Sequence, residues 1–457
     1  FANNLWWRNI NYDNAPDGWS GEDFLEKVVA GGNTYYVATN GSDSNPGTAS
    51  SPFRSIQTGV NAAVAGDTVI VMAGTYFERV IMPNSGTSAS RITVKGTKSG
   101  STFQTIVDQH DTVLTNWTQD FAVDPNGRVW KTTKPTWSSP EGNIEACSMT
   151  ADGLNIWHIN YNISDGRNTD PFWFFGHNAL SFLAISPTEE KTYNEGTSVQ
   201  FSTPIWQPIQ ALFANVGSSI YLRFKDGDNP NSKAIRVLPF SQQCALPSGA
   251  ATRYATFLLD SKNYITIQDL DIVGKVALHG NSGNNIVTGN KIRGGDFKVV
   301  MANDASGNTI SSNEIFGNSI AYTAHVPGMA QYYNAPVPDS IKPTHIQYSV
   351  QKFIVGEQDG TDYGIIGGTS TIISGNTFYN QELAIYAGNL STISGNTFHN
   401  HAGTCLYFQE LANSITIANN LFYECSGPIR SNYYGHDVAG FTAYIYGNKF
   451  YNVPSMG

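Results

Sequence analysis

Two acidic residues, Asp362 and Glu382, are the best candidates for chemistry in this chain of 457 residues. Each stands 14 residues before an asparagine, Asn376 and Asn396 respectively, that opens a recurring phrase. If these phrases lie on adjacent strands, about 4.8 Å apart, two outward carboxylates would have nearly the separation of about 5 to 5.5 Å that retaining glycosidases use. One would attack the anomeric carbon and the other would protonate the leaving oxygen, because mutual repulsion raises one pKa. The alternative is an ordinary pair of surface acids.

Polar and aromatic residues follow in the same part of the chain, and we expect them to bind the substrate on the same face. Such side chains also occur on solenoid surfaces that bind nothing, and this remains the alternative for each one. The predicted substrate-binding residues are Tyr386, Tyr407, His399, His401, Glu410, Arg430, Tyr434 and His436.

The recurring phrase indicates how these residues are positioned. Its four last copies begin at Asn376, Asn396, Asn420 and Asn448, which are 20, 24 and 28 residues apart, and earlier copies begin at Asn290 and Asn313. Self-similarity at a period of about 20 to 25 residues is the signature of a solenoid.

The residues in and before each copy of the phrase indicate which kind of solenoid it is. Short runs with β-branched residues at alternate places precede the asparagines, as in Ser370–Ser374 and Asn413–Ala418, and this alternation indicates strands. Asparagine tolerates left-handed backbone geometry and can bond the corner amides of the next coil. The pattern therefore predicts an all-β chain, a right-handed parallel β-helix; a sandwich with coincidental turns would not explain the repeated phrase.

Residues 34–96 provide the most recognisable segment. A strand at 35–38 and a turn-rich loop at 40–48 precede an amphipathic helix at 51–63, and a first coil follows at 65–76. This order resembles the N-terminal cap and first coil of secreted β-helix proteins, among them pectate, alginate and chondroitin lyases and several glycoside hydrolases. The resemblance implies a cap helix that closes the solenoid core.

The repeat disappears between about Ser101 and Leu259, where turn-rich segments indicate antiparallel strands. The order of phrases is similar to the inserted β domain of β-helix glycosidases of the β-xylosidase type. The expected organisation is an N-terminal arm or cap at 1–33, cap and first coils at 34–100, an inserted antiparallel region at 101–259, and coils at 260–457 with a long loop at about 319–355.

A calcium site is the alternative use of the acids near Asp362. Glu357 and Asp359 supply hard oxygen ligands of the kind that Ca2+ prefers, and the run Asp359-Gly360-Thr361-Asp362 looks like the calcium segment of some β-helix pectate lyases. Those enzymes use a lysine as base, but no lysine occurs here between Lys352 and Lys449. A histidine, tyrosine or arginine base would then be needed.

Composition narrows the class of protein. Charged residues make up 14% of the chain and the formal net charge is −10, which argues against nucleic acid as a partner. No apolar run is long enough to span a membrane, and a first residue other than methionine suggests a processed, secreted or cell-surface protein. Four cysteines are too few for a disulfide scaffold. Cys405 and Cys425 stand at different distances from their asparagines, so stacking is not expected to bring them together.

Three functions are therefore compatible with the sequence. The first is a secreted glycoside hydrolase acting on a polysaccharide or oligosaccharide through Asp362 and Glu382. The second is a calcium-dependent polysaccharide lyase. The third is a non-catalytic surface or filament-forming β-helix that self-associates through its N-terminal arm or its solenoid ends.

Overall fold

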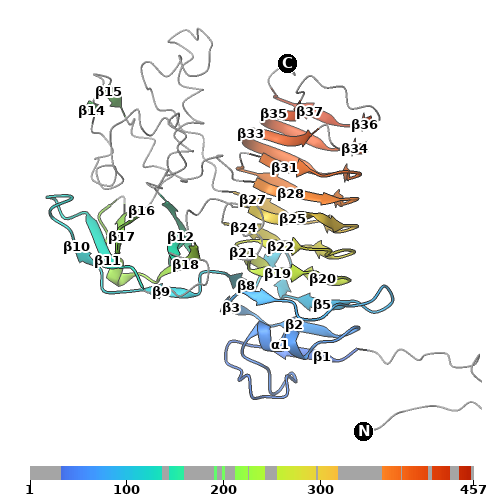
Figure 1. Ribbon diagram of the computed structural model, residues 1–457, viewed down its shortest axis with the longest axis horizontal. Helices are drawn as coiled ribbons and strands as arrows, with labels where there is room; N and C mark the ends of the chain where they lie inside the picture. The colour runs from blue at the N-terminus through green and yellow to red at the C-terminus, as the bar shows by residue number, and fades with distance from the viewer. Residues whose placement is uncertain are drawn as a thin grey trace, which may run out of the picture.

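The computed structural model describes residues 32–135, 144–158, 190–192, 198–200, 211–224, 226–241, 255–294, 297–317, 363–381, 383–409, 414–432 and 442–453. Two parallel sheets in this part of the chain stack coil upon coil into one solenoid (Figure 1). Connections between parallel strands are right-handed almost without exception, and the fold is a right-handed parallel β-helix. The predicted fold class is confirmed.

The first sheet has ten strands, and each coil contributes one of them. Every pairing in it is parallel. In spatial order the strands are β1 (Thr34–Val37), β2 (Thr68–Val71), β5 (Ile92–Lys95), β20 (Ile265–Gln268), β23 (Ile286–Thr288), β26 (Thr309–Ser311), β29 (Ile372–Ser374), β32 (Thr392–Ser394), β34 (Ser414–Ala418) and β36 (Thr442–Tyr446).

The second sheet has fifteen strands in two rows. The first row contains β3 (Gly74–Phe77), β8 (Thr105–Asp108), β21 (Asp271–Val273), β24 (Lys291–Arg293), β27 (Glu314–Phe316), β30 (Thr377–Tyr379) and β37 (Lys449–Tyr451). The second row contains β4 (Val80–Ile81), β19 (Phe257–Asp260), β22 (Val276–His279), β25 (Phe297–Ser306), β28 (Tyr363–Thr369) and β31 (Leu383–Ala387). Two long strands, β33 (Thr397–Gln409) and β35 (Leu421–Asn432), run through both rows and join them around one corner.

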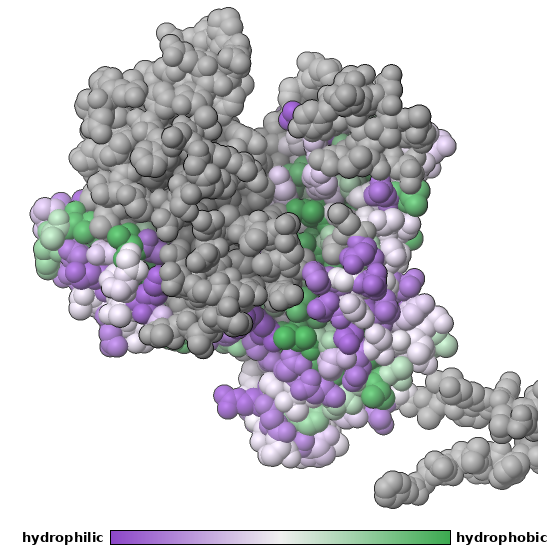
Figure 2. Space-filling view, viewed as in Figure 1, coloured by the Kyte–Doolittle hydropathy of each residue, from purple (hydrophilic) through white to green (hydrophobic). Residues whose placement is uncertain are grey.

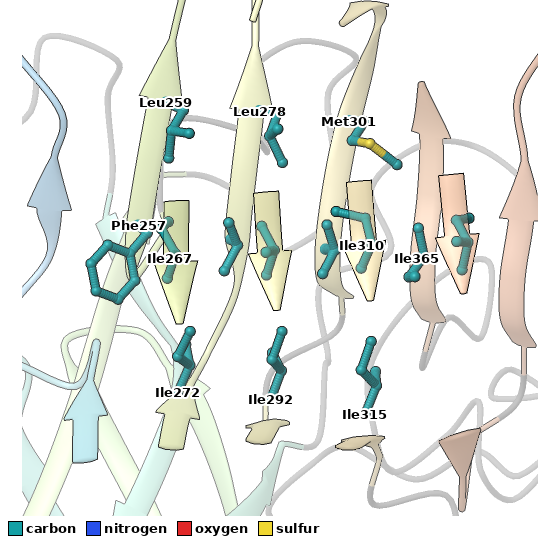
Figure 3. Close-up of a cluster of buried hydrophobic side chains, with 14 of the residues drawn as sticks. Phe257, Leu259, Ile267, Ile272, Leu278, Ile292, Met301, Ile310, Ile315 and Ile365 are labelled. Carbon is teal, nitrogen blue, oxygen red and sulfur yellow. The ribbon is translucent and has the colours of Figure 1, made fainter. Parts of the chain in front are cut away.

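Alternating side chains build the core, because the middle residue of each three-residue strand points inward. Ile272, Ile292 and Ile315 on β21, β24 and β27 are register partners and form one row, and Leu259 and Leu278 face them from the second row of strands (Figure 3). All five side chains are fully buried. Burial of a side chain of this size stabilises a fold by about 1.5 to 3 kcal/mol, so each coil adds its own increment of stability.

The recurring asparagines form one buried ladder, as predicted. Asn376 donates its backbone N–H to Oδ1 of Asn396 at 2.9 Å, and Asn396 donates in the same way to Asn420. The prediction that the ladder asparagine itself takes the left-handed conformation is wrong. The residue before it does so, as at Gly375 and Gly395 with φ of 64°, because the asparagine must start the next strand.

A cap helix, α1 (Ile56–Ala62), closes the first coil, as the sequence predicts. Ser55 caps its N-terminus by accepting a hydrogen bond from the Thr58 N–H at 3.2 Å. The Glu78 carboxylate, which follows β3, accepts from the Ile56 and Gln57 N–H groups at 2.9 and 3.1 Å. The first coil therefore fixes the helix that covers it.

The predicted inserted β domain is also confirmed, and it lies beside the lower coils (Figure 1). Its eight-stranded sheet has the order β10 (Thr118–Gln119), β11 (Val129–Thr133), β17 (Ser219–Phe224), β16 (Ala211–Val216), β13 (Leu154–His158), β12 (Ile144–Ala151), β18 (Ile235–Ser241) and β9 (Thr112–Leu114). The pairings are antiparallel except for β13 with β16. A separate core that includes Trp117, Phe213 and Leu222 holds this sheet together.

Shorter elements complete the described part. They are the hairpins β6 (Lys98–Ser99) with β7 (Thr102–Phe103) and β14 (Glu190–Thr192) with β15 (Ser198–Gln200), and a short 3-10 helix at Pro230–Ser232. Among the described helices, none has the length and apolar character required to cross a bilayer.

Candidate functional site

Both long excursions of the chain leave the solenoid at the same corner, between the first and second rows of the larger sheet. Residues 109–256 connect β8 to β19, and residues 317–362 connect β27 to β28. On the two coils between them the same connection is short: Gly274 and Lys275 separate β21 from β22, and residues 294–296 separate β24 from β25. Segments carried on a rigid scaffold supply function more often than the scaffold itself, so this corner and the strands beside it form the candidate site.

Three of the predicted substrate-binding residues come together beside this corner. Ile366, Tyr386, Tyr407 and Arg430 are register partners on β28, β31, β33 and β35, and we call them the tyrosine column. The two tyrosines are half-buried and Arg430 is exposed. The ring centroids of Tyr386 and Tyr407 are 5.2 Å apart, with a tilt of 39° between the planes.

The tyrosine column continues an apolar line on the lower coils. Ile81, Leu258, Ala277 and Val300 precede Ile366 at the same register position, and Leu258 and Ala277 are buried. Figure 2 shows apolar atoms among the hydrophilic ones along the solenoid. Along this line the side chains thus change from aliphatic to aromatic to cationic toward the C-terminal coils. The tyrosine column, at its upper end, offers rings, hydroxyls and a guanidinium to a ligand.

The predicted catalytic residues, Asp362 and Glu382, directly precede strands β28 and β31 in the sequence, but both lie outside the described residues. Tyr363 and Leu383, which directly follow them, are register partners on β28 and β31. The other predicted residues outside the described part are Glu357, Asp359, Glu410, Tyr434 and His436.

His399 lies across the corner from the tyrosine column, in a second line of outward side chains on the first row. Phe316, Tyr379, His399 and Tyr423 stack ring upon ring, with centroids 4.7, 5.0 and 5.0 Å apart, and we call them the ring ladder. Because the ring faces contact one another, a ligand can reach only their edges. Burial lowers the pKa of His399, although the charge of Glu424 opposes the shift. At neutral pH His399 therefore offers a neutral ring edge.

The expectation for His401 is corrected. This side chain is 4% exposed and points into the core, where its ring nitrogens lie 3.2 Å from the Gln381 carbonyl oxygen and 3.1 Å from that of Phe378. Burial lowers its pKa to about 4, against the effect of these two carbonyls. After the left-handed residue Asn400, the strand alternation restarts, which turns position 401 inward.

Sequence reasoning missed Gln381, which directly precedes Glu382. Its side chain is fully buried, and neither its Oε1 nor its Nε2 has a hydrogen-bond partner in the described structure. A Cβ atom placed on Gly364, one coil earlier, would lie 3.0 Å from both atoms. A buried amide without partners costs about 1 to 3 kcal/mol, and the only sequence signal for it is its position at the corner.

Arg293, which was also missed, extends the ring ladder downward, and Asp271 lies beside this line. Arg293 is the register partner of Phe316, and its Nε donates to Oδ1 of Asp271 at 2.9 Å. Asp271 itself is the register partner of Lys291, so its ion pair with Arg293 joins two neighbouring columns, and only the alignment of coils reveals it.

No cluster of three or more histidine, cysteine, aspartate or glutamate side chains that could hold a metal ion occurs among the residues the structure describes. The predicted calcium ligands Glu357 and Asp359 lie outside them, so that site stays a prediction.

A comparison with protein families matches residues 39–81 to DUF1565, described as a protein of unknown function. The matched segment contains α1, β2 and β3, and runs to the end of β4. Stacked parallel sheets continue from it to β36 and β37. The chain is a parallel β-helix protein.

A curated relative of this β-helix protein is the uncharacterized protein YwoF of Bacillus subtilis (strain 168). It is 42% identical over 64 residues, which are 14% of either chain.

Similar solved structures include the complex of XylC with xylose, at 17% identity and a TM-score of 0.44. The match covers 92% of this chain and 65% of that one, so this chain spans less than two thirds of XylC. Pectate lyase Pel9A follows at 10% identity, a TM-score of 0.39, and coverage of 93% and 78%. An alginate lyase from Paenibacillus sp. str. FPU-7 matches at 12% identity, a TM-score of 0.34, and coverage of 87% and 96%.

Proposed function

We propose that this β-helix protein is a secreted or cell-surface glycoside hydrolase that cleaves a polysaccharide or oligosaccharide with Asp362 and Glu382. The observation that carries the proposal is the pairing of Tyr363 with Leu383. Because adjacent strands lie about 4.8 Å apart, carboxylates just before these two residues would have a spacing close to that of a retaining glycosidase.

The proposed reaction has two steps. One carboxylate attacks the anomeric carbon while the other, as the acid, gives its proton to the leaving oxygen, and the glycosidic bond breaks. A water molecule then gives its proton to the second group and its oxygen to the anomeric carbon, which releases the first carboxylate.

The tyrosine column would hold the sugar beside these acids. Aromatic rings combine an apolar body with a polar hydroxyl, and this suits a sugar ring, which has C–H faces and hydroxyl edges. Arg430 at the upper end adds an exposed cation three coils beyond Ile366 along the same column. The ring ladder would contribute the neutral edge of His399 from the other side of the corner.

The test is glycan cleavage by the wild type and by conservative variants. We expect reducing-sugar release from at least one member of a panel that includes xylan, alginate and pectate, with the anomeric configuration retained. D362N and E382Q should each lose activity by about 10²- to 10⁴-fold. The matched control is D304N, which neutralises an exposed carboxylate on β25 and should remain active.

Other outcomes would select the other functions. Unsaturated products that require Ca2+, lost in E357Q or D359N, would replace the proposal with a calcium-dependent lyase. No product from any glycan, together with ordered polymers in electron micrographs, would identify a structural β-helix. Full activity in both D362N and E382Q would refute the assignment of the acids.

A further inference from the structure

Residues 380–382, which link β30 to β31, lie outside the regular strand ladder. Strands β30 and β33 pair as far as Tyr379 with His399, and pairing resumes only where Leu383 of β31 meets Thr404 of β33. Three residues of one coil thus correspond to four of the next, and the extra residue interrupts the ladder. Contacts other than strand pairing must therefore fix this corner.

The imidazole of His401, on the next coil, makes such contacts. Its Nδ1 lies 3.2 Å from the carbonyl oxygen of Gln381, and its Nε2 lies 3.1 Å from that of Phe378. The two carbonyls stand on either side of Asn380, whose φ of 53° is left-handed. Because burial lowers the pKa of His401 to about 4, the ring is neutral at pH 7 and donates to one of the two carbonyls.

The side chain of Gln381 does not hold the corner itself. It is fully buried, and its amide makes no hydrogen bond in the part of the chain that the structure describes. His401, in contrast, is well placed to hold it, because its ring is 4% exposed and packs against the ring of Phe398, with 6.3 Å between the centroids. A buried ring with packed neighbours has little freedom to leave its position.

We propose that His401 is a positioning residue for Glu382, an inference that rests on the proposed function. Gln381 directly precedes Glu382 in the sequence, so the carbonyl that His401 contacts belongs to the peptide unit joining these two residues. A peptide unit is planar, and a hydrogen bond to its oxygen therefore also fixes the N and Cα atoms of Glu382. His401 thus acts through the backbone, without contact to the substrate.

The position of Glu382 decides the rate of the proposed reaction. The carboxyl group that protonates the leaving oxygen must lie within hydrogen-bond reach of it, and a misplacement of about 1 Å can lower a rate about 100-fold. Substrate binding depends mainly on other side chains, those of the tyrosine column and the ring ladder. Loss of the contact to Gln381 is therefore expected to lower kcat and to change KM little.

Two amide variants separate the two contacts of His401. In His401→Asn the Nδ2 group takes nearly the place of the ring Nδ1 and can donate to the Gln381 carbonyl. In His401→Gln the Nε2 group takes nearly the place of the ring Nε2 and can donate to the Phe378 carbonyl. His401→Met supplies neither donor. Asparagine leaves the larger cavity, so His401→Asn should be less stable than His401→Gln.

Cys425 provides the matched control. It is the register partner of His401 on the following coil and is 1% exposed. Its Sγ lies 3.6 Å from the carbonyl oxygen of Phe398, the register partner of Phe378. The thiol thus repeats one contact of His401 without reaching Gln381, and Cys425→Ala should keep the wild-type kcat.

The first measurement is kcat and KM on a glycan that the wild type cleaves. We expect kcat to fall by about 10- to 100-fold in His401→Gln and His401→Met, and to stay within about threefold of wild type in His401→Asn. A purely structural role would instead follow stability and make His401→Asn the worse of the two amide variants. That order, or full activity in His401→Met while E382Q is inactive, would overturn this inference and leave the proposed function standing.

The second measurement needs no substrate. Hydrogen exchange of peptides that contain the Glu382 amide should be faster in His401→Gln and His401→Met than in the wild type and His401→Asn. Equal exchange in all four proteins would refute the positioning role even if no glycan were cleaved. Full activity in E382Q would refute the proposed function, and this inference with it.

Discussion

Asn396 offers the sharpest test of the stacking that underlies the whole fold. Its side chain is 1% exposed and makes four hydrogen bonds. Nδ2 donates to the Ile373 carbonyl at 2.9 Å and to Oδ1 of Asn420 at 3.0 Å, while Oδ1 accepts from the backbone N–H and the Nδ2 of Asn376 at 2.9 and 3.0 Å. Asn396→Ala removes all four bonds at once.

The cost follows from the groups that lose their partners. Asn376 Nδ2 keeps its bond to the Ile310 carbonyl, and Asn420 Oδ1 still accepts from the Asn396 backbone. The Asn376 N–H and the Ile373 carbonyl lose the partner that Asn396 supplied, and each such buried group costs about 1 to 3 kcal/mol. We expect Asn396→Ala to lower the free energy of unfolding by about 3 to 4 kcal/mol.

Asn448→Ala is the matched control, because Asn448 makes equivalent bonds to the neighbouring coil. Asn448 is only half-buried, so water can replace its side chain, and the loss should be about 1 kcal/mol. All nine tryptophans lie at or before residue 206 and outside the solenoid strands, so their fluorescence would not report on these coils. Hydrogen exchange of peptides from 372–432 is the appropriate assay. Equal losses in the two variants would refute the argument.

Three further predictions concern single groups. Burial alone would raise the pKa of Asp124, but the hydrogen bonds from Arg128 outweigh burial and lower this pKa to about 2. The ionised Asp124 therefore stabilises the folded protein by about 2 kcal/mol. This stabilisation is present above pH 3.8 and is lost as the pH falls through about 2. Asp124→Asn should remove this step from acid unfolding followed by tryptophan fluorescence, and an unchanged acid transition would contradict it. His401 has a pKa of about 4 because of burial, so the solenoid should lose roughly 3 kcal/mol as the pH falls from 6.5 to below 4. Far-UV circular dichroism melts should show this loss in the wild type and a smaller one in His401→Gln; parallel curves would rule out the assignment. Gly364→Ala places a Cβ 2.4 Å from a backbone oxygen of the next coil and should cost about 1 to 3 kcal/mol. Gly427→Ala, with its nearest contact at 3.4 Å, is the control and should melt like the wild type.

The repeated asparagine phrase was sufficient to predict the architecture from the sequence, because one buried side chain per coil can bond its neighbours only if the coils stack in register. The asparagine ladder follows from that periodicity alone. The periodicity also places Tyr386, Tyr407 and Arg430 on the same part of successive coils, but their exact register depends on the extra residue in β33. A regular repeat carries its own alignment, so residues 20 or more positions apart could be placed side by side from their order in the chain.

The direction of side chains at the corners was decided only by the tertiary structure. Left-handed Asn400 turns His401 into the core, and the extra residue in β33 brings Tyr407 into register with Tyr386 and Arg430. Periodicity predicts which coil position a residue occupies, but a single backbone change at a corner shifts every following side chain from one face to the other. The inward or outward direction near the corner therefore depends on local backbone geometry, which no spacing in the sequence records.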